Sequence, residues 1–267
     1  MTPRQLSWMR IKAIARRHRY VLARSPHRLF DVTVWPLVDV LLFGSIGAFV
    51  GATNAAGAAA FGYLLGGIVL WHVIYQAQIA VSTGFMEETW SRNLLNIMVT
   101  PTKEYEYVAG VALFGLLKLV MGVGLVALTA LIFFSFDITD LGLGLIPIAA
   151  ILLAAGWIIA LFVIGTVLRF GSGAEALAWG ILFVVMPLSG VFYPVEALPG
   201  AVQPLAFALP TTHAFAAMRT LLDGDGIDWG ALGIAAASTV GLGIVALMFL
   251  TKMLELFRRR GYISRYS

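Results

Sequence analysis

The chain has 267 residues, of which 60% are hydrophobic and only 12% are charged, and its mean hydropathy is +0.90. Soluble domains carry about 25% charged residues, so a water-soluble fold of this size is excluded. The chain has no cysteine, which excludes disulfide scaffolds, thiolate zinc sites and cysteine nucleophiles. The formal net charge is +4, and eight of the 18 basic residues fall between Arg4 and Arg28, with no acid among them.

The basic N-terminal arm, residues 1–30, predicts an amphipathic helix at a membrane surface. No long apolar run begins before about Val32, so the arm does not resemble a signal peptide. On a helical wheel most apolar side chains share one arc and most basic side chains share the other, although Arg4 and His18 break the pattern. We expect the helix to lie on an anionic cytoplasmic leaflet, with a frayed basic tail as the alternative. So short an arm is not expected to bind nucleic acid.

Six apolar runs follow, each close to the about 20 residues that a helix needs to cross a bilayer core. They lack the alternating pattern of a membrane β-barrel. We therefore expect an all-α membrane domain over residues 31–257, with a basic tail over 258–267. The predicted spans are Val32–Val50, Phe61–Val81, Tyr107–Phe134, Leu143–Leu168, Ala176–Tyr193 and Gly230–Leu250.

Lysines and arginines outside the spans predict the orientation, because these residues collect in cytoplasmic loops. Sixteen of them flank the spans on one side, Arg219 alone lies on the other, and Lys118 lies within a span. Six spans with both termini in the cytoplasm fit this alternation. An odd number of spans would place the C-terminal arginines outside.

Two connections are longer than a tight turn requires. The second, on the predicted cytoplasmic side, starts with Glu87 and Glu88, which suit a helix N-terminus, and ends at Pro101, which stops a helix. It predicts a short amphipathic helix whose apolar face packs on neighbouring helix ends or docks into a partner. The fifth, Tyr193–Pro210, is too apolar for a free loop and too broken by proline for one span. It predicts two short, re-entrant helices at the outer side.

Two charged residues lie inside predicted spans, where an unpaired charge costs several kcal/mol. Asp39 on the first span and Lys118 on the third both fall in the predicted cytoplasmic half. They form an ion pair, or Lys118 extends its ammonium group towards the membrane surface; the sequence leaves both open.

Aromatic and amide side chains on the second and fifth spans are candidates for a translocation path or an outer gate. Bundle filling and interface belts are the alternative role for aromatic residues. The candidates are Trp71, Tyr75, Gln76, Trp179, Phe183, Phe192 and Tyr193.

The sequence contains no motif for nucleotide binding, metal binding or nucleophilic catalysis. It has no GxxxxGK[ST] segment, so it does not bind ATP in the P-loop manner. The histidines lack HExxH or similar spacing, and His72 and His213 are expected to be polar residues of the bundle rather than metal ligands. No Ser-His-acid set is suggested, so we expect a protein without catalytic residues, metal or cofactor.

Three segments, in their order and spacing, resemble the ABC-2 family of exporter permeases over nearly the whole chain. The basic arm leads into Trp35-Pro36-Leu37. The stretch Glu87–Pro101 is an acidic segment that runs into a leucine-rich turn and closes on Thr-Pro. The segment from Ser189-Gly190-Val191-Phe192-Tyr193-Pro194-Val195 to Leu209-Pro210-Thr211-Thr212-His213 is similar to the signature that follows the family's fifth span.

The resemblance implies a permease of the bacterial cytoplasmic membrane that forms a homodimer or a paired half-transporter. Two separate ATPase subunits would bind ATP and Mg²⁺ and drive the export of a lipid-linked glycan, a polysaccharide or an amphipathic drug. The family's outer-gate role maps onto Phe192–Leu209. Its ATPase-coupling role maps onto Glu87, Glu88, Trp90, Arg92, Asn93, Leu94, Leu95, Met98 and Pro101.

Two other classes compete with this interpretation. An ion-driven secondary transporter would usually show more acidic residues within its spans and an internal repeat. A membrane-embedded enzyme would need a cluster of ionisable residues around one cavity. The spans offer little of either.

Overall fold

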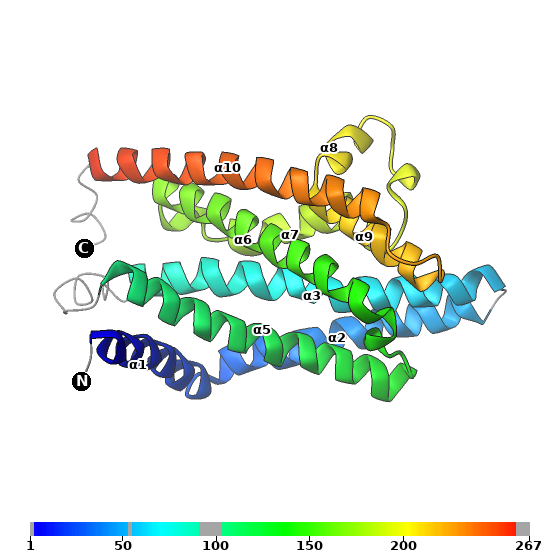
Figure 1. Ribbon diagram of the computed structural model, residues 1–267, viewed down its shortest axis with the longest axis horizontal. Helices are drawn as coiled ribbons and strands as arrows, with labels where there is room; N and C mark the ends of the chain where they lie inside the picture. Colours follow the sequence, from blue (N-terminus) through cyan, green and yellow to red (C-terminus); the bar gives the residue numbers. More distant parts are fainter. Residues whose placement is uncertain (1–2, 53–54, 91–102, 260–267) are drawn as a thin grey trace.

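A computed structural model describes residues 3–52, 55–90 and 103–259, and its regular elements over these ranges are all helical. Figure 1 shows long helices packed side by side into an elongated bundle, with α1 and the last turns of α10 at one end. We call this end, where α3 and α10 finish and α5 starts, the basic end. In chain order the elements are α1 (Pro3–Ala23), α2 (Pro26–Gly51), α3 (Ala55–Trp90), α5 (Glu104–Phe134), η1 (Ile138–Gly144), α6 (Leu145–Phe170), η2 (Ser172–Ala174), α7 (Leu177–Leu188), η3 (Val195–Ala197), α8 (Gln203–Phe207), α9 (Pro210–Leu222) and α10 (Trp229–Arg259).

Five helices within the described residues are long and apolar enough to cross a membrane, and each contains one predicted span. The remaining predicted span, Ala176–Tyr193, contains α7. With 12 residues, α7 is about 18 Å long, shorter than a bilayer core of about 30 Å. The chain nevertheless returns from the basic end to the opposite end through α7 and the segment after it (Figure 1).

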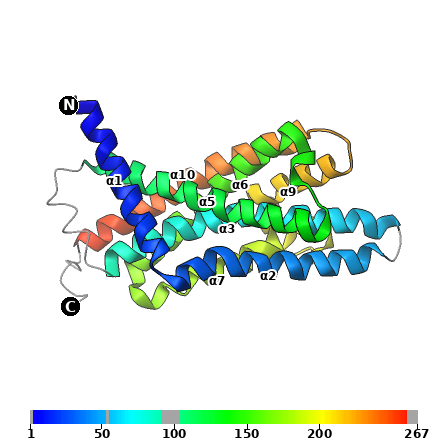
Figure 2. The ribbon, with the colours of Figure 1, turned by 90° about the horizontal axis from the view of Figure 1, so that it is seen from below.

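The N-terminal arm separates from the first long helix by a short break. Helix α1 ends at Ala23, and α2 begins at Pro26, whose fixed φ and missing N–H suit the first turn of a helix. Ser25, between them, is extended, with φ of −114°. Helix α2 thus begins ahead of the predicted boundary at residue 30. Figure 2 shows α1 crossing the bundle at a steep angle, and it packs chiefly against α5.

Helix α3 is the central helix of the bundle. It packs against α2, α5, α6, α7 and α9, and 78% of its most apolar stretch is buried, against 11% for α5 and 17% for α10. Helix α6 approaches it closely at Gly156, where a Cβ atom would lie 2.7 Å from the carbonyl oxygen of Ile74. The apolar faces of α5 and α10 are left for lipid or for a partner.

The acidic pair of the second connection belongs to α3 rather than to a separate helix. Helix α3 continues to Trp90, so Glu87 and Glu88 lie in its last turns and not at a helix N-terminus. The predicted position of this pair is therefore wrong. The short amphipathic helix expected further along falls on residues 91–102, outside the described residues.

At the end opposite α1, short elements replace long helices. Helix α5 stops at Ser135, which adopts a left-handed conformation with φ of 53° and lets Phe136 N–H bond back to Ala130 O at 3.2 Å. The proline-rich connection forms α8 and α9, in keeping with the two short helices predicted there. The second of them, α9, spans Pro210–Leu222 and so extends beyond the predicted connection.

Candidate functional site

Buried hydroxyl groups connect the end of α7 to α9. The hydroxyl oxygens of Ser189 and Thr211 lie 2.7 Å apart, and Thr212 Oγ1 donates to Ala206 O at 2.6 Å. His213 Nε2 lies 2.9 Å from the carbonyl oxygen of Phe207. Two motifs separated by about 20 residues in the sequence are thus parts of one hydrogen-bonded unit, and His213 contacts the backbone within it.

Arg219 of α9 holds the turn that follows α7. Its Nη1 donates to Gly190 O at 2.6 Å, and Gly190 has φ of +60°, which favours glycine. Burial lowers the pKa of the Arg219 guanidinium, and the carboxylates of Glu196 and Asp223 act in the opposite direction. The one basic residue predicted for the outer side is therefore built into this end of the bundle.

The turn held by Arg219 presents an aromatic side chain to α2. The rings of Phe192 and Phe43 are stacked, with centroids 4.2 Å apart and an interplanar angle of 18°. Tyr193, next in the chain, donates its hydroxyl hydrogen to Pro187 O at 3.0 Å. Phe192 is therefore a contact between the turn and the first long helix, and Tyr193 closes the turn on itself.

One turn along α2 from Phe43, Asp39 faces α3. Its Oδ2 lies 3.5 Å from Nε2 of His72, whose side chain is 2% exposed, while Asp39 remains 36% exposed. The other ring nitrogen, Nδ1, lies 2.9 Å from Ile68 O, and the ring contacts Tyr75, with centroids 5.8 Å apart. Asp39, Phe43, His72, Tyr75 and Phe192 form a continuous group, which we call the α2–α3 polar–aromatic site.

The structure separates the predicted path residues into three groups. Trp71 and Gln76 are buried in the bundle core, and Trp179 and Phe183 lie exposed on α7, Phe183 at 79%. Tyr75, Phe192 and Tyr193 are partly buried. Only Tyr75 and Phe192 belong to the α2–α3 polar–aromatic site.

Sequence reasoning did not pair Asp39 with His72, and it considered Gln78 only as a candidate for lining a pathway, not as a contact between helices. The amide of Gln78 is fully buried and donates to Ser82 Oγ at 2.9 Å and to Ala178 O at 3.0 Å, which connects α3 to α7. Opposite charge was the only signal used to find intramembrane pairs, and neither a histidine nor an amide carries a formal charge.

The predicted Asp39–Lys118 pair stays a prediction. Asp39 has His72 as its neighbour, whereas Lys118 lines a small cleft together with Ala80 of α3. Measured along the axis of α3, Ala80 lies about 12 Å nearer the basic end than His72. This position favours the other expectation, in which the lysine extends towards the membrane surface.

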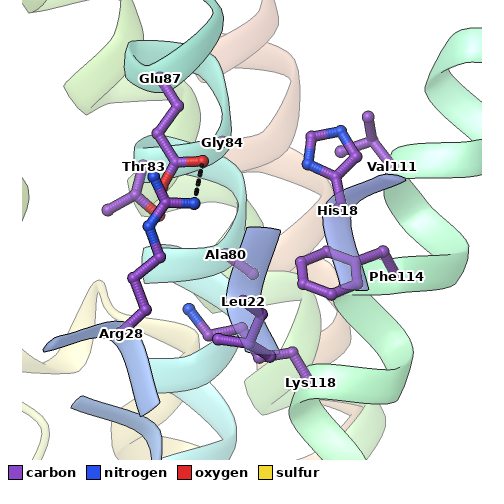
Figure 3. A pocket seen from close by; sticks show the side chains of 10 residues that line it. All are labelled: His18, Leu22, Arg28, Ala80, Thr83, Gly84, Glu87, Val111, Phe114 and Lys118. Atoms are coloured by element: carbon purple, nitrogen blue, oxygen red, sulfur yellow. Dashed lines mark hydrogen bonds and ion pairs between the residues drawn. The ribbon is translucent and has the colours of Figure 1, made fainter. Parts of the chain in front are cut away.

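The small cleft lies between α1, α2, α3 and α5 at the basic end (Figure 3). Across it Arg28 Nη1 donates to Glu87 Oε2 at 3.0 Å, as the dashed line marks, and the ring of His18 lies over Phe114. Of the predicted coupling residues, Glu87 is therefore an ion-pair partner of α2. The other predicted coupling residues fall outside what the structure describes. They are Glu88 and Trp90, whose side chains are not described, and Arg92, Asn93, Leu94, Leu95, Met98 and Pro101.

A second ion pair fixes α1 to the start of α5. Arg10 Nη1 lies 3.3 Å from Glu106 Oε2, which also accepts the backbone N–H of Lys103 at 2.9 Å. The Lys103 N–H and, further, the Ser7 and Arg10 side chains lower the pKa of the Glu106 carboxyl, against the opposing effect of burial. Arg10 and Glu106 belong to no motif, so no local pattern predicts their contact.

The site and its surroundings contain no arrangement suited to a metal. Within the part of the chain that the structure describes, no three His, Asp or Glu side chains come together as metal ligands would. The chemistry that the described residues offer is recognition by a carboxylate and aromatic rings.

Comparison with known families gives one match. The family model described as ABC-2 type transporter matches residues 9–222, which is most of the chain and includes α1 from Met9 onward, the cleft, the α2–α3 polar–aromatic site and α9. No curated protein matches the sequence.

Proposed function

The chain belongs to the ABC-2 type transporter family, and we propose that it is the membrane permease subunit of an ATP-driven exporter. Its five long apolar helices make it a multi-pass membrane protein. We place it in the bacterial cytoplasmic membrane, with two separate ATPase subunits and a second permease copy. The substrate is a lipid-linked glycan, a polysaccharide or an amphipathic drug. The family match over residues 9–222 carries the proposal.

In this proposal the basic end is cytoplasmic and receives the ATPases. Helix α3 ends there and α5 begins there, and the coupling segment, Glu87–Pro101, starts in the last turns of α3. Two ion pairs support this role, because Arg28–Glu87 and Arg10–Glu106 join α1, α2, α3 and α5 around the point where the segment leaves. A displacement of the segment would pass directly into α3, which contacts most of the bundle.

The six-span arrangement, with both termini inside, is also part of the proposal. The fifth crossing would be made by α7 together with the turn at Gly190. The exposed aromatic side chains of α7, Trp179 and Phe183, then face the second copy, which shields from lipid the non-helical backbone after α7. Phe192–Leu209 forms the outer gate.

Single-cysteine crosslinking tests the proposal, because the chain has no cysteine of its own. A cysteine at Asn93 should crosslink to the ATPase encoded beside the gene, and one at Asp140, at the opposite end, should not. The same purified complex should hydrolyse ATP, and the purified chain alone should not. Crosslinking from Asp140 instead of Asn93 would contradict both the orientation and the mechanism.

One observation favours a second candidate, an ion-coupled secondary transporter. The Asp39–His72 pair lies within two long helices, where ion-driven transporters carry their titratable groups. Transport that persists without ATPase and stops on collapse of the proton gradient would support this candidate. Transport that needs the ATPase excludes it.

A further inference from the structure

We propose that the contact between Gln76 of α3 and Gly122 of α5, which we call the α3–α5 seam, opens during the transport cycle, and that the Gln76 amide then faces a hydrated path. The proposal rests on the proposed function, because the coupling segment connects the end of α3 to the start of α5. A displacement of this segment acts on the two helices that form the seam.

The first observation is the burial of Gln76 without partners. The residue is 1% exposed, and neither the nitrogen nor the oxygen of its amide has a hydrogen-bond partner among the described residues. Measured along α3, it lies about 16 Å from Glu87, which is near the middle of a bilayer core of about 30 Å. A buried amide that forms no hydrogen bond has lost its bonds to water without replacement. Gln76 therefore destabilises the closed seam.

The second observation is the close packing of α5 against this amide. A Cβ atom at Gly122 would lie 2.7 Å from Cδ of Gln76, so the amide fills the space that the glycine leaves. Gly122 has no side chain that could bond to the amide. Moving α5 away from α3 is the change that brings water to Gln76.

Helix α5 is the partner that can move. Its most apolar stretch is 11% buried, whereas that of α3 is 78% buried. Helix α5 packs chiefly against α1, α2 and α3, while α3 also packs against α6, α7 and α9. The Arg10–Glu106 ion pair joins α5 to α1. A displacement of the coupling segment would therefore move α5 together with α1, and the rest of the bundle would hold α3 in place.

A second glutamine on α3 shows the arrangement of a structural amide at nearly the same depth. Gln78 is 0% exposed, and its nitrogen donates to Ser82 Oγ at 2.9 Å and to Ala178 O at 3.0 Å, although its oxygen has no partner among the described residues. Gln78 thus connects α3 to α7 by hydrogen bonds. Gln76 makes no such connection to α5, which leaves the α3–α5 seam the weaker of the two contacts.

The first test compares Gln76→Met with Gln78→Met in the purified full-length protein without an ATPase. Methionine has a similar volume and no amide. Gln76→Met should raise the Tm by about 3–6 °C, because it removes an unpaired amide from the closed seam. Gln78→Met should lower the Tm, because it removes two hydrogen bonds. A Gln76→Met protein that melts at or below the wild-type Tm, or does not fold, overturns the proposal, because the amide then has a partner in the closed seam.

The second test measures the opening in the complex with the ATPase, in phosphatidylcholine nanodiscs. A single cysteine replaces Gln76, and its reaction with a charged methanethiosulfonate reagent, which requires water at the thiol, is followed by mass spectrometry. The reaction should be at least about tenfold faster during ATP hydrolysis than without nucleotide.

The control for this reaction is Ile74→Cys. Ile74 is 0% exposed and lies on the opposite face of α3 from Gln76, where Gly156 of α6 packs. A cysteine there should react slowly under both conditions. Equal rates for Gln76→Cys with and without ATP, in a complex that hydrolyses ATP, overturn the opening and leave the permease assignment standing. If the chain binds no ATPase, the permease assignment fails, and the opening fails with it.

Discussion

The two ends of the bundle are held together in different ways. Opposite α1, hydrogen bonds hold one segment together, Ser189 to Thr211, Thr212 to Ala206 and Arg219 to Gly190, and Tyr63 of α3 donates to Asp223 at the end of α9. At the basic end, ion pairs connect separate helices whose partners are 59 and 96 residues apart, Arg28 to Glu87 and Arg10 to Glu106. The first pattern fixes one segment as a unit. The second joins separate helices through long side chains, of which Arg10, Arg28 and Glu87 are partly exposed and Glu106 is buried.

This difference assigns different roles to the two ends. A hydrogen-bonded unit around α7, α8 and α9 moves as one body or stays in place, which suits a gate. At the basic end separate helices are joined by ion pairs between long side chains, which suits the end that receives a mechanical input. We expect substitutions at the basic end to affect coupling, and substitutions opposite α1 to affect stability.

The largest effect is expected from Leu94→Asp in the coupling segment. A charge placed in a desolvated contact with an ATPase costs several kcal/mol when it is unpaired. Association with the ATPase and substrate-stimulated hydrolysis should fall sharply, as measured by co-purification and by phosphate release. Membrane insertion and dimerisation should persist, because the spans are unchanged.

The matched control for Leu94→Asp lies at the other end. Asp137→Asn and Asp140→Asn, opposite the proposed ATPase side, should leave ATPase association at the wild-type level. If these substitutions weakened association and Leu94→Asp did not, the roles assigned to the two ends would be reversed.

A smaller effect is expected at Arg219. Arg219→Met removes the donor to Gly190 O and leaves a buried carbonyl without its partner, which costs about 1–3 kcal/mol. The free energy of unfolding in detergent should fall by about that amount, while ATPase association is retained. Arg24→Met, at an exposed arginine, is the control and should change stability little. Equal stability of the two variants would mean that Arg219 does not hold the turn.

The long helices were predictable because their apolar residues are continuous along the sequence. Five predicted spans lie within helices of the structure, and the motifs at Ser189 and Thr211 pointed to the end where they meet. Each of these features depends on local sequence or on a short repeat of residue types.

Features that depend on partners distant in sequence were predicted less well. Glu87 and Glu88 were placed at a helix start because acidic residues are unfavourable near a helix C-terminus. Arg28, 59 residues earlier, offsets that penalty for Glu87, and no local pattern reveals it. The Asp39–Lys118 pair, suggested by charge and depth, stays a prediction. The packing of α2 on α3 also places His72 beside Asp39, and no local pattern reveals this neighbour.

The smallest effect concerns the Arg10–Glu106 contact between α1 and α5, and it appears as a dependence on pH. The Lys103 N–H and the Ser7 and Arg10 side chains hold the pKa of Glu106 below its ordinary value of about 4.5. A carboxylate with a lowered pKa in the folded state stabilises that state above its unfolded pKa, and this contribution is lost as the pH falls through the folded value. Docking of α1 should therefore be independent of pH from 7 to about 5 and weaken only below about 4.5.

The distance between spin labels at Lys12 and Val111 would report the docking of α1 on α5. Glu106→Gln should show weaker docking at neutral pH and lose the acid transition, whereas Glu255→Gln, on α10, should keep it. An acid transition that persists in Glu106→Gln would show that another group anchors α1, and the basic end would then be joined by fewer ion pairs than the comparison of the two ends requires.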